Sequence, residues 1–389
     1  MAIHNTTYRF TGSTAGRVAF AFSLAFGALS FAPTTASAEV TLADIIRNLQ
    51  QNEELYENIE IAMQETYDIG DRKPEGFEFS GRKGSEISHK QSETRCVSQG
   101  KWFRIDRKGV SKNAKRAFSL DRFRAFDGEK TRVFEQNAIA NISDERLEDS
   151  TFIRPHMLAI RYMDLPIPFS VYLSGHEAIR KHPLAQWSES LTLDVSYEGE
   201  DTLANLTCHR VFVMVRTKSG HVSSRVEFWL AEERNYLPIK RYLFSPSKSK
   251  TIPIGESTMS DLREIKPGIW MPFDTTVKAF DRFAVRDEGR QKLRWKQQYV
   301  VERAELDPKY DRSFFSNMEL PDGAAVYQLE DRKIVRSWRQ GGPKAKGAPT
   351  TAAGFQKWWI LWVNVAVVLL LVAIFVVRKM TVTGGNVKQ

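Results

Sequence analysis

The sequence predicts an α+β protein built on an antiparallel β-sheet, with a single transmembrane helix at its C-terminal end. Three observations lead to this prediction. Apolar and polar residues alternate in successive runs between residues 190 and 306, which is the period of strands with one buried face. Residues 144–183 interrupt the alternation with apolar residues at helical spacing. Residues 358–377 contain one polar residue, Asn364, and no charge.

The elements that precede the main run can be assigned in chain order. Thr41 has the pattern of a helix N-cap, and apolar residues at helical spacing continue to about residue 55. Alternation then predicts a first strand over residues 57–67. Two hairpins follow between residues 92 and 134, the second around the turn Asp127-Gly128.

The main run, residues 190–306, is predicted to be a meander of strands with one apolar face. Such a face must be covered by a helix, a second sheet or a ligand, and the helical insertion at residues 144–183 is the natural cover. The alternating apolar residues are Leu191, Leu193, Val195 and Tyr197, then Cys208, Phe212 and Met214, then Val226, Phe228 and Leu230, then Met271 and Phe273, and finally Trp295, Tyr299 and Val301.

The two ends of the chain carry targeting signals. An apolar stretch and the small-residue pattern Ala36-Ser37-Ala38 predict a signal peptide cleaved after residue 38, with an uncleaved anchor as the alternative. The predicted domains are the signal peptide at 1–38, an exported domain at 39–340, a flexible linker at 341–357, the transmembrane helix at 358–377 and a short cytoplasmic tail at 378–389.

The span and its flanks predict a location. A helix of these twenty residues is about 30 Å long, the thickness of a hydrocarbon core. Arg378 and Lys379 follow the span directly and would stop it at the inner interface. We therefore expect a single-pass protein of the inner membrane, with its large domain on the periplasmic side.

The net charge argues against a nucleic-acid partner. Of the formal charge of +9, residues 1–38 carry +2 and residues 344–389 carry +6, which leaves +1 for residues 39–343. A nearly neutral main domain lacks the basic footprint of a phosphate-backbone binder.

Motifs for catalysis and metal binding are incomplete. His176-Glu177 begins like a zinc-protease helix, but Arg180 stands where the second histidine would be. Gly255-Glu256-Ser257 begins like a nucleophile elbow, but Met259 replaces the closing glycine. We therefore predict no enzyme activity, no metal and no cofactor.

Cys96 and Cys208 both lie in strand-like runs of the predicted exported domain. In an oxidising compartment they could form a disulfide, and two buried thiols are the alternative.

Apolar side chains are the main candidates for a binding site in this sequence. Aromatic and methionine-rich walls suit a pliable hydrophobic cavity, although plain core packing would use the same residues. The candidate ligand-lining residues are Phe212, Met214, Phe228, Leu230, Met271, Phe273, Ile153, Met157 and Met163.

The order of elements resembles the LolA/LolB-like lipoprotein-carrier fold. The segments that carry the resemblance are Lys101–Asp106, Phe123–Lys130, Tyr236–Lys240 and Pro267–Pro272. The resemblance implies a strongly curved, unclosed half-barrel of antiparallel strands wrapped around a helical lid.

The resemblance also implies a function. In that family the space between sheet and helices receives acyl chains of lipoproteins, and a related module senses envelope lipoproteins or lipids. The expected partners are therefore a membrane, through the single span, and a lipid or lipoprotein. The alternative is a non-enzymatic scaffold with a self-filled core that binds an envelope protein.

Overall fold

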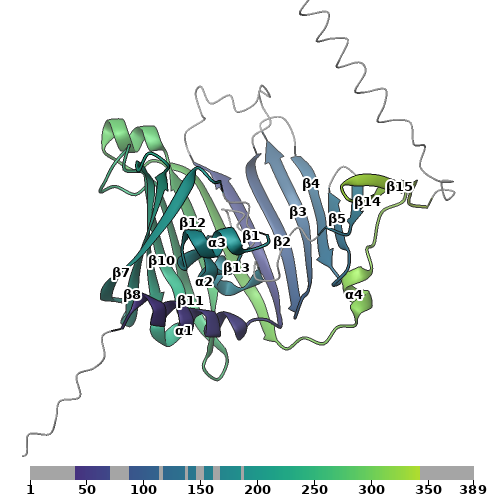
Figure 1. The fold of residues 1–389 in the computed structure, drawn as a ribbon. Coiled ribbons are helices and arrows are strands. Elements are labelled where there is room, and N and C mark those ends of the chain that lie inside the picture. The colour runs from purple at the N-terminus through teal and green to yellow at the C-terminus, as the bar shows by residue number, and fades with distance from the viewer. Residues whose placement is uncertain are drawn as a thin grey trace, which may run out of the picture. The chain divides into compact units, whose positions relative to one another are not determined.

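Fifteen strands form one open sheet in the computed structural model (Figure 1). The structure describes residues 40–341 apart from 71–86, 114–116, 136–138, 146–152, 161–166 and 185–187. The strand order is β15-β14-β6-β5-β4-β3-β2-β1-β13-β12-β11-β10-β9-β8-β7. Strand β1 therefore pairs with β13, so an N-terminal and a C-terminal strand meet at the middle of the sheet.

The strands contain between 5 and 14 residues. Their bounds are β1 Ile59–Ile69, β2 Ile87–Gln99, β3 Trp102–Asn113, β4 Ala117–Phe126, β5 Thr131–Glu135, β6 Ile139–Ser143, β7 Leu191–Leu203, β8 Leu206–Thr217, β9 Val222–Ala231, β10 Leu237–Phe244, β11 Gly255–Lys266, β12 Ile269–Phe280, β13 Leu293–Leu306, β14 Ala325–Glu330 and β15 Lys333–Arg339.

The helices are short, with one exception. Helix α1 has 13 residues, and the N-cap predicted at Thr41 is present as part of a capping box with Asp44, because the Thr41 hydroxyl accepts from the Asp44 amide at 3.2 Å. The helical bounds are α1 Leu42–Glu54, η2 Pro155–Met157, α2 Phe169–Leu173, α3 His176–Lys181, η4 Glu232–Arg234, η5 Ala284–Glu288 and α4 Arg312–Ser316.

The strand register defines which side chains share a face. Val211 pairs with Phe228, Phe228 with Arg241, and Arg241 with Ser257. Paired residues project to the same side of a sheet, so these four side chains lie on one face. We call this face the inner face.

The inner face of β7–β10 is covered by helices rather than by a second sheet. Helices α1, α2 and α3 contribute Ile45, Leu49, Phe169, Leu173 and Ile179 to one buried apolar cluster with these strands. Burying a side chain of this size stabilises the fold by about 1.5–3 kcal/mol. The helical cover, defined as α1, η2, α2 and α3, is thus a major part of the core.

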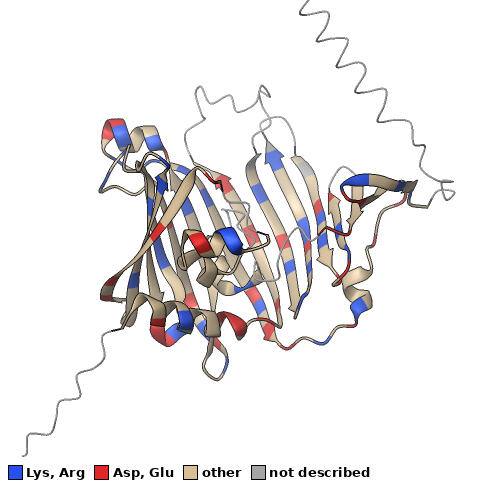
Figure 2. Cartoon of the chain, viewed as in Figure 1, with Lys and Arg blue, Asp and Glu red and all other residues tan. Residues whose placement is uncertain are grey.

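The opposite face is crossed by the segment between β13 and β14. The Tyr310 hydroxyl donates to Glu60 at 2.5 Å, and the Arg95 guanidinium donates to the same carboxylate at 3.0 Å. Burial alone would raise the pKa of Glu60, but these hydrogen bonds and the Arg95 and Arg303 charges lower it on balance. Figure 2 shows such opposite charges interleaved along the strands.

The predicted fold class needs two corrections. The sheet is mixed rather than antiparallel, because β14 pairs with β6 in parallel, with Ala325 opposite Ile139. In its described residues the predicted helical lid is divided into short pieces, because η2 has only three residues and Gly175, with φ 88°, separates α2 from α3.

The predicted membrane placement is also wrong. Among the residues that the structure describes, none of the helices is long and apolar enough to cross a membrane. The span expected at residues 358–377 lies outside the described part of the chain, as do the signal peptide, linker and tail. The single-pass inner-membrane location is therefore withdrawn.

Asn235 joins helix α1 to two turns at one end of the sheet. It adopts a left-handed backbone with φ 55°, which is uncommon for residues other than glycine. Its Nδ2 donates to Oδ1 of Asn52 and to the carbonyl of Gly268, both at 2.9 Å. Its Oδ1 accepts from the backbone amide of Trp270 at 2.7 Å. The β9–β10 turn, the β11–β12 turn and the cover therefore meet on one side chain.

We expect Asn235→Ala to lower the free energy of unfolding by roughly 2–4 kcal/mol, because it removes these hydrogen bonds and disfavours the left-handed backbone. Denaturant titration measures the loss. Asn205 has φ 62° and is exposed, so Asn205→Ala is a matched control that should cost only about 1 kcal/mol. Equal losses in the two variants would contradict the role given to the Asn235 side chain.

Candidate functional site

The candidate site is the inner face of β7–β13 together with its helical cover. Phe169 of α2 lies edge-on to Phe228 of β9, with ring centroids 5.0 Å apart. Tyr172 of the same helix also meets Phe228 edge-on, at 6.3 Å. All three rings are at most 1% exposed. The cover thus holds the apolar face by aromatic packing, which requires no fixed hydrogen-bond partner.

Glu53 fastens helix α1 to the start of helix α2. Its two carboxylate oxygens accept from the backbone amides of Phe169 at 2.6 Å and Ser170 at 3.2 Å. These amides have no partner within their own helix, so the carboxylate supplies one. Burial raises the pKa of Glu53, although the bonds from Ser170 and the charge of Arg154 oppose this shift. The carboxylate therefore links helix α1 to helix α2 within the cover.

His156 fastens the η2 turn to Asn235. Its Nε2 donates to the Asn235 carbonyl at 2.7 Å, and its ring lies edge-on to Tyr56 at 5.5 Å. Its Nδ1 is buried and makes no hydrogen bond within the described part of the chain. Burial lowers the pKa of His156 to about 4, because the interior penalises the charged ring. The imidazole is therefore neutral in the folded protein at neutral pH.

This shift predicts a loss of stability in mild acid. The folded pKa of about 4 lies below the ordinary value of 6.5, so between these values the unfolded chain takes up a proton that the folded chain does not. From pH 7 to pH 5 the His156 contribution to the unfolding free energy should fall by about 2 kcal/mol. His156→Gln should lessen the pH dependence by that amount, as measured by denaturation at both pH values. An unchanged slope would contradict the buried neutral ring.

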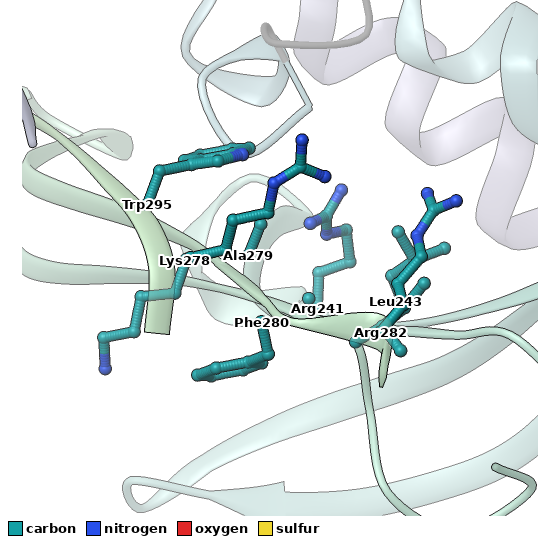
Figure 3. A pocket seen from close by; sticks show the side chains of 10 residues that line it. Arg241, Leu243, Lys278, Ala279, Phe280, Arg282 and Trp295 are labelled. Carbon is teal, nitrogen blue, oxygen red and sulfur yellow. The ribbon is translucent and has the colours of Figure 1, made fainter. Parts of the chain in front are cut away.

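A pocket opens on the inner face where β10–β13 end (Figure 3). Leu243 pairs with Gly255, Gly255 with Ala279, and Ala279 with Trp295, so one row of paired residues forms its floor. Its volume is about 110 Å³. The lining residues are Arg241, Leu243, Ile254, Gly255, Lys278, Ala279, Phe280, Arg282, Arg294 and Trp295.

The structure brings most of the predicted ligand-lining residues onto or next to the inner face. Phe228, Leu230 and Met157 belong to the cluster beneath helices α1–α3. Ile153, Met271 and Phe273 belong to the neighbouring cluster around β1, β12 and β13. Each of the six is at most 9% exposed. Their role as a ligand lining stays a prediction.

Phe212 and Met214 lie on the opposite face. Phe212 pairs with Glu227, one position away from the pair of Val211 and Phe228. The guanidinium of Arg210 lies over the Phe212 ring at 5.3 Å. The predicted face was wrong for β8 because this strand carries apolar residues on both sides. Met163, the remaining candidate, lies outside the described residues.

Both cysteines are buried thiols. Burial raises the pKa of the Cys208 thiol to about 11, which disfavours the thiolate that disulfide chemistry needs. Whether Cys96 and Cys208 become paired stays a prediction.

Arg241 is a site residue that the sequence pattern did not identify. Its side chain is 1% exposed and lies on the inner face between Ile239 and Leu243. The sequence did contain a signal for this residue, because Arg241 occupies a position of β10 whose alternating neighbours are apolar. A charged residue at a core parity is uncommon and indicates a buried polar function.

No group of three or more metal-ligating side chains occurs among the described residues. The site offers apolar contact from the inner face and cover, with positive charge at one end.

Comparison with known proteins gives matches to solved structures only. No protein-family model matches the chain. No curated protein matches it in sequence.

Three similar structures illustrate the matches. An outer membrane lipoprotein-sorting protein domain from Vibrio parahaemolyticus is 10% identical, with a TM-score of 0.34 over 71% of this chain and 95% of that one. A DUF1329 family protein from Desulfovibrio piger and a LolA superfamily protein from Nitrosomonas europaea are each 12% identical. Each has a TM-score of 0.35 over 71% of this chain and 97% of its own.

These similar structures include the LolA family that the sequence resemblance named. At TM-scores this low, the likeness carries no argument about what the chain binds. The function must be argued from the residues of the chain itself.

Proposed function

We propose that this protein binds the acyl chain of a lipid or lipoprotein between the inner face of its sheet and its helical cover, without catalysing a reaction. The observation that carries the proposal is the kind of cover. A broad apolar sheet face is closed by short helices, α2 with 5 residues and α3 with 6, rather than by a second sheet.

Such a cover can exchange with a ligand. Helices this short are unstable in isolation, because nucleation is costly and few hydrogen bonds repay it. They persist here because Phe169 and Tyr172 pack on Phe228. An acyl chain offers the same apolar contact to the sheet at about 25 cal/mol per Å² of buried surface. Replacing the ring contacts by a chain is therefore nearly neutral in free energy.

The pocket at the end of β10–β13 is too small for an acyl chain. Its volume of about 110 Å³ is below the roughly 300–1,000 Å³ of typical small-molecule sites. We therefore expect the chain to lie beneath the cover, which it must displace. Release of the cover would require breaking the hydrogen bonds of Glu53, His156 and Asn235.

One observation favours a second candidate. Phe169 and Phe228 are both completely buried, at 0% exposure, so the protein's own side chains fill this part of the core. A filled core suits a scaffold that presents its surface to an envelope protein, which is the alternative raised by the sequence.

Paired substitutions on the two faces of the sheet test the proposal. We expect Phe228→Ala to weaken binding of a fluorescent fatty-acid probe about tenfold or more, because an aromatic contact worth about 1.5–3 kcal/mol is removed. Phe212→Ala deletes the same ring from the opposite face and should leave binding within about twofold. Circular dichroism verifies folding, and Leu230→Ala replaces Phe228→Ala if that variant does not fold.

The unmodified protein provides the decisive comparison. Lipid recovered by native mass spectrometry, or measurable affinity for the fatty-acid probe, is the expected result. Neither lipid nor affinity would contradict acyl binding and leave the scaffold function.

A further inference from the structure

We infer that the pocket at the end of β10–β13 binds the phosphate group of an anionic amphiphile, whose acyl chain lies on the adjoining inner face. The inference rests on the proposed function and adds the chemical class of the ligand. It is carried by the composition of the pocket, its position in the register and its size.

The pocket gathers positive charge. Three arginines, Arg241, Arg282 and Arg294, are among its ten lining residues, and none of the ten is acidic. Arg241 is 1% exposed at the base, whereas Arg282 and Arg294 are exposed. The guanidinium groups of Arg241 and Arg282 point to the same side in Figure 3. Guanidinium forks match phosphate oxygens in geometry and bind them by paired, charge-assisted hydrogen bonds.

The remaining walls strengthen this charge. Leu243, Ile254, Phe280 and Trp295 supply apolar lining to the pocket. Low-dielectric walls increase the attraction between a cation and an anion relative to water. Two acids adjoin lining residues in the sequence, Glu256 after Gly255 and Asp281 after Phe280. Glu256 lies opposite Lys278 in the strand register. Asp281 uses Oδ1 to accept from the amides of Phe283 at 2.8 Å and Ala284 at 3.3 Å. This oxygen is therefore engaged in starting helix η5.

The pocket is continuous with the acyl-binding face. Arg241 pairs directly with Phe228, the residue on which the cover packs. Leu243 touches both the cluster beneath the cover and the small cluster of Ile254, Phe280 and Val285 at the end of the sheet. A ligand whose charged end contacts Arg241 can therefore place its chain along Phe228.

The pocket volume suits a headgroup and excludes a chain. It is about 110 Å³, somewhat less than the cavity of about 150 Å³ that accommodates one benzene molecule. A phosphate group fits this space, and a long acyl chain does not. The same chemistry could come from free phosphate, so the experiment must separate the two sources.

Binding of three probes to the full chain tests the inference. The probes are dihexanoyl phosphatidylglycerol, uncharged dihexanoylglycerol with the same chains, and inorganic phosphate. We expect phosphatidylglycerol to bind about tenfold tighter than dihexanoylglycerol, as a charge-assisted contact to phosphate predicts. Inorganic phosphate should bind more weakly than phosphatidylglycerol, because it makes no contact with the inner face.

Charge-removing variants locate the site. The double variant Arg282→Gln/Arg294→Gln alters exposed residues and should reduce the preference for phosphatidylglycerol to about twofold, with dihexanoylglycerol binding unchanged. Arg241→Gln should do the same if circular dichroism shows that it folds. Lys278→Gln is the matched control, because Lys278 alternates with Ala279 and its ammonium points away from the guanidinium groups (Figure 3). It should leave the preference intact.

The outcomes separate this inference from the proposed function. Equal binding of the charged and uncharged lipids would overturn the headgroup site and leave acyl binding standing. A preference that survives in the double variant would also overturn it. Inorganic phosphate that binds as tightly as phosphatidylglycerol would assign the pocket to free phosphate instead. Failure of both lipids to bind would overturn the proposed function itself.

Discussion

Burial of one apolar sheet face beneath short helices is the constraint on which the rest of the structure depends. The strands from β7 to β13 present rows of Val, Phe, Leu and Met side chains that water does not solvate favourably. No second sheet is available among the described elements, because all fifteen strands belong to one sheet. The cover must therefore come from helices, and three polar anchors fix where those helices lie.

The anchors explain why a weakly helical segment keeps a defined position. Glu53 binds the first amides of α2, His156 binds the Asn235 carbonyl, and Asn235 binds α1 and the β11–β12 turn. Each anchor is a buried polar group, and such a group is costly when its partner is lost. Apolar packing against the sheet stabilises the cover, and the anchors fix its position.

The sequence predicted the features that local pattern controls. Thr41 and the apolar spacing after it placed helix α1 within one residue, and alternation placed the inner-face residues of β7, β9 and β13 correctly. Local pattern gave the wrong face for β8, because this strand carries apolar residues on both faces. It also did not predict the break at Gly175, where the backbone interrupts a segment with helical spacing. It could not reveal the parallel pairing of β14 with β6, because that contact joins segments far apart in the chain.

The segments that carry the family resemblance have structural roles. Tyr236–Lys240 begins beside Asn235, and Pro267–Pro272 contains Gly268 and Trp270, which bond to the Asn235 side chain. These two segments therefore lie where the turns and the cover are joined. The residues that give the candidate site its chemical character, Arg241 above all, lie outside these turns. Fold and ligand class are specified separately, as is common for widely used folds.

Hydrogen–deuterium exchange of the full chain, with and without dihexanoylglycerol, tests the central claim most directly. If the cover is exchangeable, the amides of α2 and α3 exchange faster than those of β8 and β9 in the free protein, and their exchange changes when lipid is added. Amides of the cover that are as protected as those of β8 and β9, and that do not respond to lipid, would contradict the claim.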